Sequence, residues 1–415
     1  MGKCSPDGMS DVAAVRSSRT AELAAPAQVR GSPMRIAIVT AATWMGGVER
    51  VVAMLANRWA GAGHGVRIMA FERTGEQPAF ALDTNVEVEQ LDLLKSSATY
   101  GEAVWNNVNR IAALRRRLGR FAPDVTLAQA TIPSILTVVA GIGRPWPTVA
   151  TEHTHPAFHR LSRSWERLRR LAYPLADEIV VPTQDVAMWV GSELRLHAQV
   201  MPNPVDLNRF GARPGRDRLQ SQRRRLIAVG RLVPEKRYGL LIDAFARSAK
   251  LDPAWDLVIY GDGPERAVLE TMIDTLGLSG RVVLAGSTSN VEQAYADADI
   301  FVHTAEYEGY GNAVQEALAA GTPVIATDSP GVARQLLQDG RYGVLVPNAD
   351  VDTLARALSA LMADGERRAS LARTARDAVL PFEVGRTAER WLDMFRKLIE
   401  QRGRPRRQGS CPKAR

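Results

Sequence analysis

Short β-branched and apolar runs alternate along the chain with longer segments in which apolar residues recur about every 3.6 positions. The first half carries strand-like runs at residues 34–42, 65–71, 124–130, 147–153 and 178–183, with a helical pattern at 47–64. This alternation is typical of strand-helix-strand units around a parallel sheet. The first half therefore predicts an α/β domain whose first strand begins at Met34.

The second half repeats the same alternation after a proline-interrupted link that runs from Asn203 to about Arg225. Its strand-like runs are residues 225–232, 255–261, 281–286, 299–304 and 323–328, and its helical patterns include 238–250, 265–277 and 290–298. We therefore predict two doubly wound α/β domains, 34–204 and 205–380. A last helical segment at 381–400 is predicted to pack back on the first domain. In this architecture, ligands bind at the carboxyl ends of the strands.

Composition adds little to this picture beyond what it excludes. The only two cysteines of the 415 residues lie in the end segments, which argues against a disulfide framework. Residues 1–33 are small and polar, without the apolar core of a secretory signal, and are predicted to be disordered. The longest apolar stretch is too short to cross a bilayer. We expect a cytoplasmic protein.

The net charge of +8 is concentrated in a few places. A predicted disordered tail, residues 401–415, contributes most of it, and a second basic cluster lies at residues 159–175, where five arginines alternate with apolar residues. At helical spacing this cluster is amphipathic, which fits either a solvated face over the core or contact with an anionic membrane surface. No nucleic-acid-binding module accompanies the charge, so we expect no nucleic acid as partner.

The stretch EGYGNAVQEALAAGTPVIATD, residues 308–328, places two glutamates around the predicted start of a helix. Asn312 is a suitable N-cap, so the backbone N–H groups of Gly309, Tyr310, Gly311 and Asn312 would face the carboxyl edge of the second sheet. A helix start of this kind suits a diphosphate. Two roles then follow for the acids. Glu316 would accept hydrogen bonds from a ribose diol, and Glu308 would bind sugar hydroxyls, although ordinary first-turn acids would look the same.

Cations and glycines follow strands in both halves. GRLVPEKR supplies Gly230, Arg231 and Lys236 after the first strand of the second half, where cations would neutralise a diphosphate and stabilise it as a leaving group. Gly46 and Gly47 separate the first strand and first helix of the chain, as a turn or as further backbone donors. We see no metal-ligand cluster and expect neither a metal nor a cofactor.

Taken in order, GGVERVV, MPNPVD, VGRLVPEKR, YGDGPER, EGYGNAVQEALAAGTPVIATD and DGRYGVLVPNAD resemble the motifs of the family-4 (group 1) retaining glycosyltransferases, from Met34 to about residue 400. The resemblance implies the GT-B fold, in which two Rossmann-like domains face each other across a cleft. It also implies transfer of a sugar from a nucleotide-sugar donor, most often a UDP-sugar, to a hydroxyl of a glycan or lipid-linked acceptor.

The resemblance implies roles at matching positions. Glu316 corresponds to the ribose-binding glutamate, Glu308 to the acid on the donor sugar, and Arg231 with Lys236 to the diphosphate-binding pair. Gly46 and Gly47 resemble the glycine loop of the first domain. The segments around Gly261 and Gly286 resemble those that line the nucleoside. In TEHTHP, His153 is the histidine that we favour near the reacting sugar.

Alternatives remain open at this point. The same fold serves sugar-nucleotide epimerases, and a binding subunit without activity would keep many of these residues. The sequence also leaves open which sugar is transferred and to which acceptor. A peripheral location at the inner face of a membrane is an expectation that follows from the basic cluster.

Overall fold

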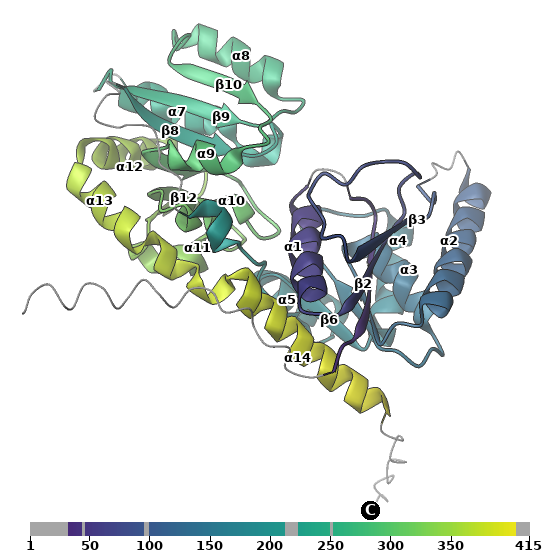
Figure 1. Cartoon of the computed structure of the whole chain (residues 1–415). Helices are drawn as coiled ribbons and strands as arrows, with labels where there is room; N and C mark the ends of the chain where they lie inside the picture. The colour runs from purple at the N-terminus through teal and green to yellow at the C-terminus, as the bar shows by residue number, and fades with distance from the viewer. Residues whose placement is uncertain (1–31, 44–45, 95–98, 212–222, 250–251, 404–415) are drawn as a thin grey trace, which may run out of the picture.

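The computed structural model describes residues 32–43, 46–94, 99–211, 223–249 and 252–403, which form two α/β lobes (Figure 1). The predicted N-terminal segment 1–33 and the predicted tail 401–415 lie almost entirely outside these residues, as does the middle of the link between the lobes. The α/β class with two Rossmann-like domains is confirmed.

The N-terminal domain is built on a seven-stranded parallel sheet in the order β3-β2-β1-β4-β5-β6-β7. Its strands are β1 (Arg35–Thr40), β2 (Gly65–Ala70), β3 (Val86–Gln90), β4 (Val125–Ala128), β5 (Thr148–Thr151), β6 (Glu178–Val181) and β7 (Gln199–Val200). Its helices are α1 (Gly47–Gly61), α2 (Tyr100–Phe121), α3 (Thr131–Gly141), α4 (Arg163–Ala172) and α5 (Gln184–Trp189). Strands β2 and β3 lie on one side of β1 and strands β4 to β7 on the other, so the topological switch of the sheet is between β1 and β4.

The C-terminal domain has a six-stranded parallel sheet in the order β10-β9-β8-β11-β12-β13. Its strands are β8 (Arg224–Val229), β9 (Trp255–Tyr260), β10 (Val282–Gly286), β11 (Ile300–His303), β12 (Val324–Asp328) and β13 (Val344–Pro347). Its helices are α6 (Leu207–Phe210), α7 (Tyr238–Ala249), α8 (Arg266–Thr275), α9 (Val291–Ala296), α10 (Asn312–Ala319), α11 (Ala333–Leu337), α12 (Val351–Ala363) and α13 (Gly365–Thr374). The carboxyl ends of β8 and β9 face the other domain.

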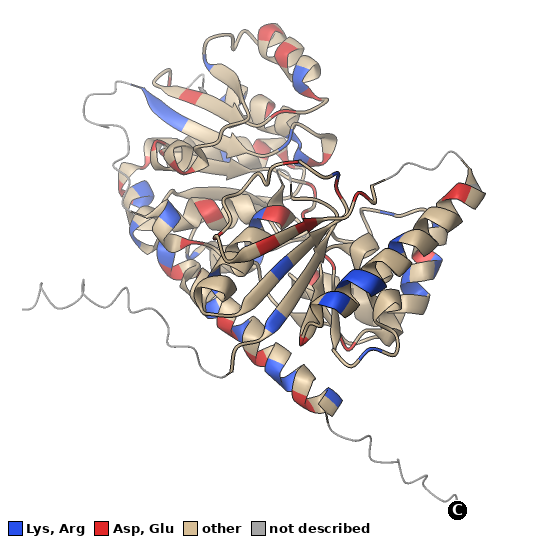
Figure 2. Cartoon of the chain, turned by 45° about the vertical axis from the view of Figure 1, so that its right-hand side comes forward, with Lys and Arg blue, Asp and Glu red and all other residues tan. Residues whose placement is uncertain are grey.

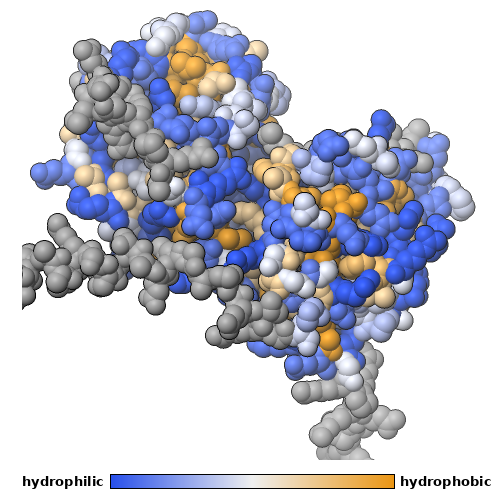
Figure 3. All heavy atoms as spheres, in the orientation of Figure 1, coloured by the Kyte–Doolittle hydropathy of each residue, from blue (hydrophilic) through white to orange (hydrophobic). Residues whose placement is uncertain are grey.

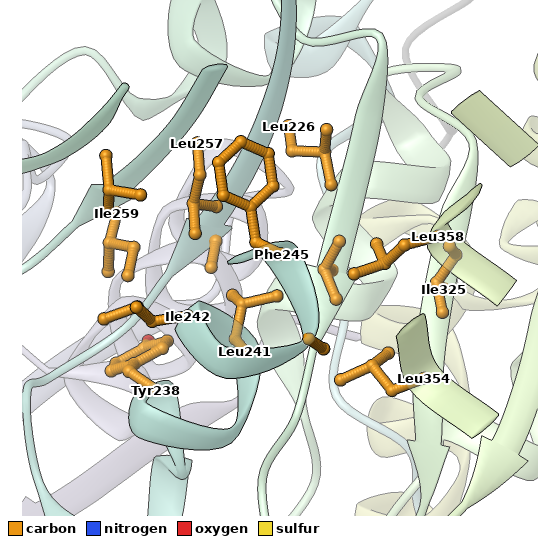
Figure 4. Packing of buried hydrophobic residues seen from close by; sticks show 14 of the residues in the cluster. Leu226, Tyr238, Leu241, Ile242, Phe245, Leu257, Ile259, Ile325, Leu354 and Leu358 are labelled. Carbon is orange, nitrogen blue, oxygen red and sulfur yellow. The ribbon is translucent and has the colours of Figure 1, made fainter. Parts of the chain in front are cut away.

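Both sheets are covered by apolar side chains, as parallel strands buried on two faces require. Every residue of β4, β5 and β11 is buried. In the C-terminal domain, Leu241 and Phe245 of α7 pack on Leu257 of β9 and meet Leu354 of α12 (Figure 4). These cores fix the strand ends from which the loops of the site extend.

Strand ends differ from the prediction where polar residues follow a short strand. The run predicted as one strand over residues 147–153 ends at Thr151, so Glu152 and His153 lie in the following loop. Two strands were missed, β3 and β13. In β3 the alternation VEVEQ leaves Glu87 and Val88 exposed, as expected of an edge strand rather than of a buried run.

The last helix, α14 (Val384–Gly403), leaves the C-terminal domain and lies along the N-terminal one (Figure 1). Trp59 of α1 donates its indole N–H to the carbonyl of Ala388 at 3.2 Å and meets the ring of Phe395 edge-on at 5.5 Å. Its solvent side interleaves acidic and basic side chains (Figure 2). The helix passes residue 400, its predicted end, and Arg402 pairs with Asp177.

Several contacts join the two lobes, which a notch separates on the surface (Figure 3). Asn203 donates to Asn312 Oδ1 at 2.9 Å, and its carbonyl accepts from Gln315 at 3.0 Å. The rings of Phe158 and Tyr307 stack with centroids 4.5 Å apart. No helix in the part of the chain that the structure describes has the length and apolar character to cross a bilayer.

Candidate functional site

A pocket of about 290 Å³ lies between the two domains, at the carboxyl ends of the C-terminal strands. From the N-terminal domain it is lined by Gly46, Arg50, Ala79 and Phe80. From the C-terminal domain it is lined by Arg209, Val229, Gly230, Arg231, Tyr260, Gly261, Asp262, Ser287, Thr288, Ser289, Val291 and Glu316. Strand ends and helix starts converge at this pocket, and five of the site residues predicted from sequence line it. These are Gly46, Gly230, Arg231, Gly261 and Glu316.

Two glycine turns form one wall of the pocket. A Cβ on Gly261, whose φ is +140°, would lie 1.8 Å from the carbonyl oxygen of Gly230. A Cβ on Gly230 would meet the hydroxyl of Tyr238 at 2.7 Å. Only glycine permits this close approach of the β8 and β9 turns, which leaves backbone groups at the pocket wall.

Two helix N-termini meet at the same place. Helix α1 follows Gly46 and helix α10 follows Gly311, and neither helix start has a side-chain cap. A Cβ on Gly47 would lie 3.0 Å from the side-chain nitrogen of Asn312, so the two starts nearly touch. Their first-turn N–H groups and positive dipole ends suit an anion between them.

The predicted N-cap of α10 is off by one residue. Asn312 is the first helical residue, and its side chain accepts from Asn203 across the domain junction instead of capping the helix. Gly311 takes the cap position with φ +107°, a left-handed value that glycine adopts without strain.

Glu316, one turn into α10, is buried and points at the pocket. Arg50 of α1 forms an ion pair with its Oε1, and the hydroxyl of Tyr295 donates to its Oε2 at 3.2 Å. Burial raises the pKa of Glu316, while Arg50 opposes that rise. A second buried acid nearby, Glu292, is paired with Arg209.

Glu308 lies in a half-buried cluster behind the glycine turn. Lys236, in the 3₁₀ turn Pro234–Lys236, pairs with its Oε1, and His303 Nε2 is 3.4 Å from the same oxygen. Burial alone would raise the pKa of Glu308, but Lys236, His303 and Arg231 hold it below its usual value. Glu308 is therefore a carboxylate that accepts hydrogen bonds, which fits the binding of hydroxyls.

His153 of the N-terminal domain lies beside the loop that carries Glu308. A Cβ on Gly309 would come within 1.8 Å of the His153 carbonyl oxygen, so the two backbones are in direct contact across the cleft. His153 Nε2 is hydrogen-bonded to the side-chain oxygen of Gln129. Burial lowers the pKa of His153 to about 4, which keeps its ring neutral at pH 7.

Other predicted residues are placed differently. The ring of Tyr310 is buried in the core, and its hydroxyl accepts from Gln315 at 3.1 Å, so only its backbone faces a ligand. Gly286 ends β10 without lining the pocket, whose wall there is Ser287 to Ser289. Arg231 is exposed at the pocket rim and is not paired with any described carboxylate.

Sequence reasoning missed four polar residues that complete the cluster: Arg50, Arg209, His303 and Gln129. His303 is buried at the end of β11, beside Glu308. Arg50 stands three residues after Gly47, at the helix start, and this spacing is a signal that would have indicated it.

The basic cluster at residues 159–175 forms α4 and the turn after it. Arg169 does not belong to the cationic face: it is buried, lies 3.3 Å from Glu152 Oε1 and also pairs with Glu166. Arg163, Arg167 and Arg170 are exposed. Leu168, Leu171 and Leu175 are exposed beside them, by 39%, 71% and 57%.

Among the described residues, no group of three or more His, Cys, Asp and Glu side chains is arranged to hold a metal ion. The positive charge in and beside the pocket comes from arginine and lysine. Arg50, Arg209 and Lys236 are each committed to a carboxylate in the ligand-free protein.

Comparison with known families matches both halves of the chain. Residues 45–209 match Glycosyltransferase Family 4, and residues 214–378 match Glycosyl transferases group 1. A Campylobacter jejuni N-acetylgalactosaminyltransferase, named for an acceptor on undecaprenol diphosphate, is 27% identical over 87% of this chain and 98% of its own. An exopolysaccharide phosphotransferase of Streptomyces coelicolor is 28% identical over 88% of this chain, but the chain spans only 41% of that protein.

Solved structures show the same fold. Anabaena HepE, in complex with UDP and glucose, superposes with a TM-score of 0.72 at 22% identity and covers 88% of this chain and 99% of its own. The sucrose-phosphate synthase of Thermosynechococcus elongatus superposes with a TM-score of 0.76 at 19% identity, over 88% of this chain and all of its own. The two-domain fold is therefore shared with these structures.

Proposed function

We propose that this chain, which belongs to the family-4 glycosyltransferases with the GT-B fold, transfers a sugar from a UDP-sugar to a hydroxyl of a glycan or lipid-linked acceptor, with retention of configuration. The observation that carries the proposal is the interdomain pocket. It is lined by Glu316, for the ribose, and two helix N-termini meet there, for a diphosphate. The Lys236–Glu308 pair, for the sugar, lies behind the Gly230 turn of the pocket wall. The alternative of an epimerase or an inactive subunit is not favoured, since the relatives are named as transferases.

The proposed donor would lie with its base against Tyr260 and residues 287–289 and its diphosphate between α1 and α10. A UDP complex of HepE, which shares the fold, supports uridine as the base. Its sugar would reach Glu308 and His153, where the ionised Glu308 accepts from two sugar hydroxyls.

In the proposed reaction the bond from the anomeric carbon to the diphosphate breaks, and the bond to the acceptor oxygen forms on the same face of the sugar. The acceptor proton passes to the leaving diphosphate. Arg231, Lys236 and the start of α10 stabilise the negative charge that develops on the diphosphate. These cations take the part that a metal ion plays elsewhere, so we expect turnover without added metal.

The test is a thermal-shift panel of UDP, GDP and ADP without metal, since a ligand that binds only the folded state raises its stability once its concentration exceeds Kd. UDP should stabilise the wild type, and Glu316→Ala should lose that effect. Turnover with chelator present, with the anomeric configuration of the product read by NMR, tests metal independence and retention. No shift with any nucleotide would contradict the proposal.

A lipid-linked acceptor would be held in a membrane, and we propose that helix α4 binds an anionic membrane surface. Its exposed Leu168 and Leu171 would enter the interface while Arg163, Arg167 and Arg170 face the lipid phosphates. The lipid-linked acceptor named for the Campylobacter relative supports this. The cytoplasmic location expected from the sequence stays a prediction.

Vesicle flotation tests the membrane proposal. With anionic vesicles, the double variant Leu168→Ser/Leu171→Ser should float far less than the wild type, in a background that lacks residues 404–415. Leu276→Ser, at an exposed leucine of the C-terminal domain that is 41% exposed, is the matched control. Equal flotation of the wild type and the double variant would show that α4 is an ordinary solvated face.

A further inference from the structure

Arg50 stands at an unexpected place, because it pairs with the one carboxylate that the proposed donor would need for its ribose. Resting on the proposed function, we propose that Arg50 holds Glu316 in the ligand-free enzyme. When the donor arrives, its ribose diol replaces Arg50 on Glu316, and the freed guanidinium binds the donor diphosphate. Arg50 would then be a donor ligand contributed by the N-terminal domain.

The ion pair and a bound ribose compete for the same atoms. Both oxygens of Glu316 are already engaged, by Arg50 on one side and Tyr295 on the other. The Glu316 side chain is only 7% exposed, so little of it is open to a ligand while Arg50 is in place. A diol that donates two hydrogen bonds to this carboxylate therefore has to displace the guanidinium.

The displaced Arg50 has a second anion within the same pocket. It belongs to the first turn of α1, next to Gly46, and lines the pocket together with Gly230 and Arg231. A guanidinium that leaves a carboxylate in a partly buried site needs a new partner, because an unpaired charge there is costly. The diphosphate supplies one, because two oxygens of a phosphate group accept two parallel N–H bonds from the planar guanidinium.

Three other cations lie in or beside the pocket, and none of them is released by ribose binding. Lys236 is paired with Glu308, and Arg209 is paired with the buried Glu292, which no proposed donor group would displace. Arg231 is exposed and already open to the ligand. Arg50 is therefore the cation whose release is coupled to ribose binding, and it belongs to the opposite domain. Donor binding thus exchanges one interdomain contact for another, which keeps the domains together.

Comparing uridine with UDP tests this exchange, because both ligands carry the ribose and only UDP carries the diphosphate. Binding of UDP is measured by titration calorimetry, and that of uridine by competition, for the wild type, Arg50→Ala and Arg50→Lys. Arg58→Ala, on α1 but outside the pocket, is the matched control. In Arg50→Ala we expect uridine to bind as tightly as in the wild type or more tightly, and UDP to bind at least about tenfold more weakly.

The ratio of the two affinities separates the outcomes, because any change in fold or in the ionisation of Glu316 acts on both ligands alike. Equal weakening of uridine and UDP would show that Arg50 only supports Glu316 and would overturn the inference. Unchanged UDP binding would overturn it as well. Arg50→Lys should fall between wild type and alanine, since lysine keeps the charge without the fork. A wild type that binds neither ligand would refute the proposed function itself.

Discussion

Adding a single methyl group at Gly309 tests the contact between the two domains most directly. In the structure, a Cβ at this position would lie 1.8 Å from the carbonyl oxygen of His153 and 2.9 Å from the Cα of Thr154. Real Cβ atoms essentially never approach a heavy atom closer than 3.0 Å, and both neighbours are backbone. Gly309→Ala therefore has to move the two loops apart by about 1.2 Å.

That displacement falls between His153 and Glu308, the residue that precedes Gly309 in the chain. Misplacing a reacting group by about 1 Å costs about a hundredfold in rate, so we expect kcat/KM to fall about a hundredfold. Nucleotide affinity should change less than kcat/KM, because the proposed base and ribose contacts, Tyr260, residues 287–289 and Glu316, lie outside the Gly309 loop. The free energy of unfolding should fall by about 1–3 kcal/mol, the usual cost of overpacking.

The assay is steady-state transfer, with UDP affinity and chemical denaturation measured on the same preparations. Gly61→Ala is the matched control, because a Cβ there meets nothing within 4 Å and alanine is the better helix former. That variant should keep full activity and gain a few tenths of a kcal/mol. Wild-type turnover in Gly309→Ala would refute the view that the reaction requires the contact between the Glu308 loop and His153.

Three further predictions follow from the same contacts. Glu308→Gln should lower kcat by about 10²–10³, since it removes the carboxylate that holds Lys236, while UDP affinity stays within a few-fold; an unaffected kcat would exclude Glu308 from the reaction. Burial lowers the pKa of His303 to about 4, so between pH 6.5 and 4 this histidine binds fewer protons in the folded state than in the unfolded state. Its contribution to stability is therefore complete above pH 6.5 and is lost on acidification. His303→Gln should accordingly lose roughly 2 kcal/mol less than the wild type from pH 7 to pH 5 in urea titrations, and equal losses would contradict the shift. Phe395→Ala should cost about 3–5 kcal/mol in chemical denaturation, because the ring is fully buried against Trp59 of the other domain, and a loss below 1 kcal/mol would show that α14 is only loosely attached.

Much of the site was predictable because it is local in sequence. Gly230 and Arg231 directly follow a strand, and Gly46 lies between the first strand and the first helix, where the hydrophobic runs are clear in the sequence. Parallel strands bring their carboxyl ends to one edge of the sheet. Glu316 has a defined place one turn into a helix that starts at that edge. Strand order, which decides that β8 lies between β9 and β11, is not encoded in any such pattern.

The parts that could not be predicted depend on partners distant in the chain. Tyr310 stands beside two glycines in the sequence, which suggests a pocket residue. Its ring instead packs in the core behind α10, and its hydroxyl accepts a hydrogen bond from Gln315. Arg169 looked like one of five surface arginines until the fold placed Glu152 beside it. Arg50 and Glu316 belong to different domains, so their ion pair forms only when the two domains come together.

Helix α14 also sets the order in which the protein is completed during synthesis. The N-terminal domain is translated first, yet its apolar surface on α1 and β1 is covered by Trp391, Leu392 and Phe395 from the last described helix. Until that helix has left the ribosome, this surface stays open to water and to other chains, which favours aggregation. Synthesis of the helix that follows the C-terminal domain is therefore the step that buries the apolar surface of the first domain. We expect the dependence of the chain on chaperones to end at that step.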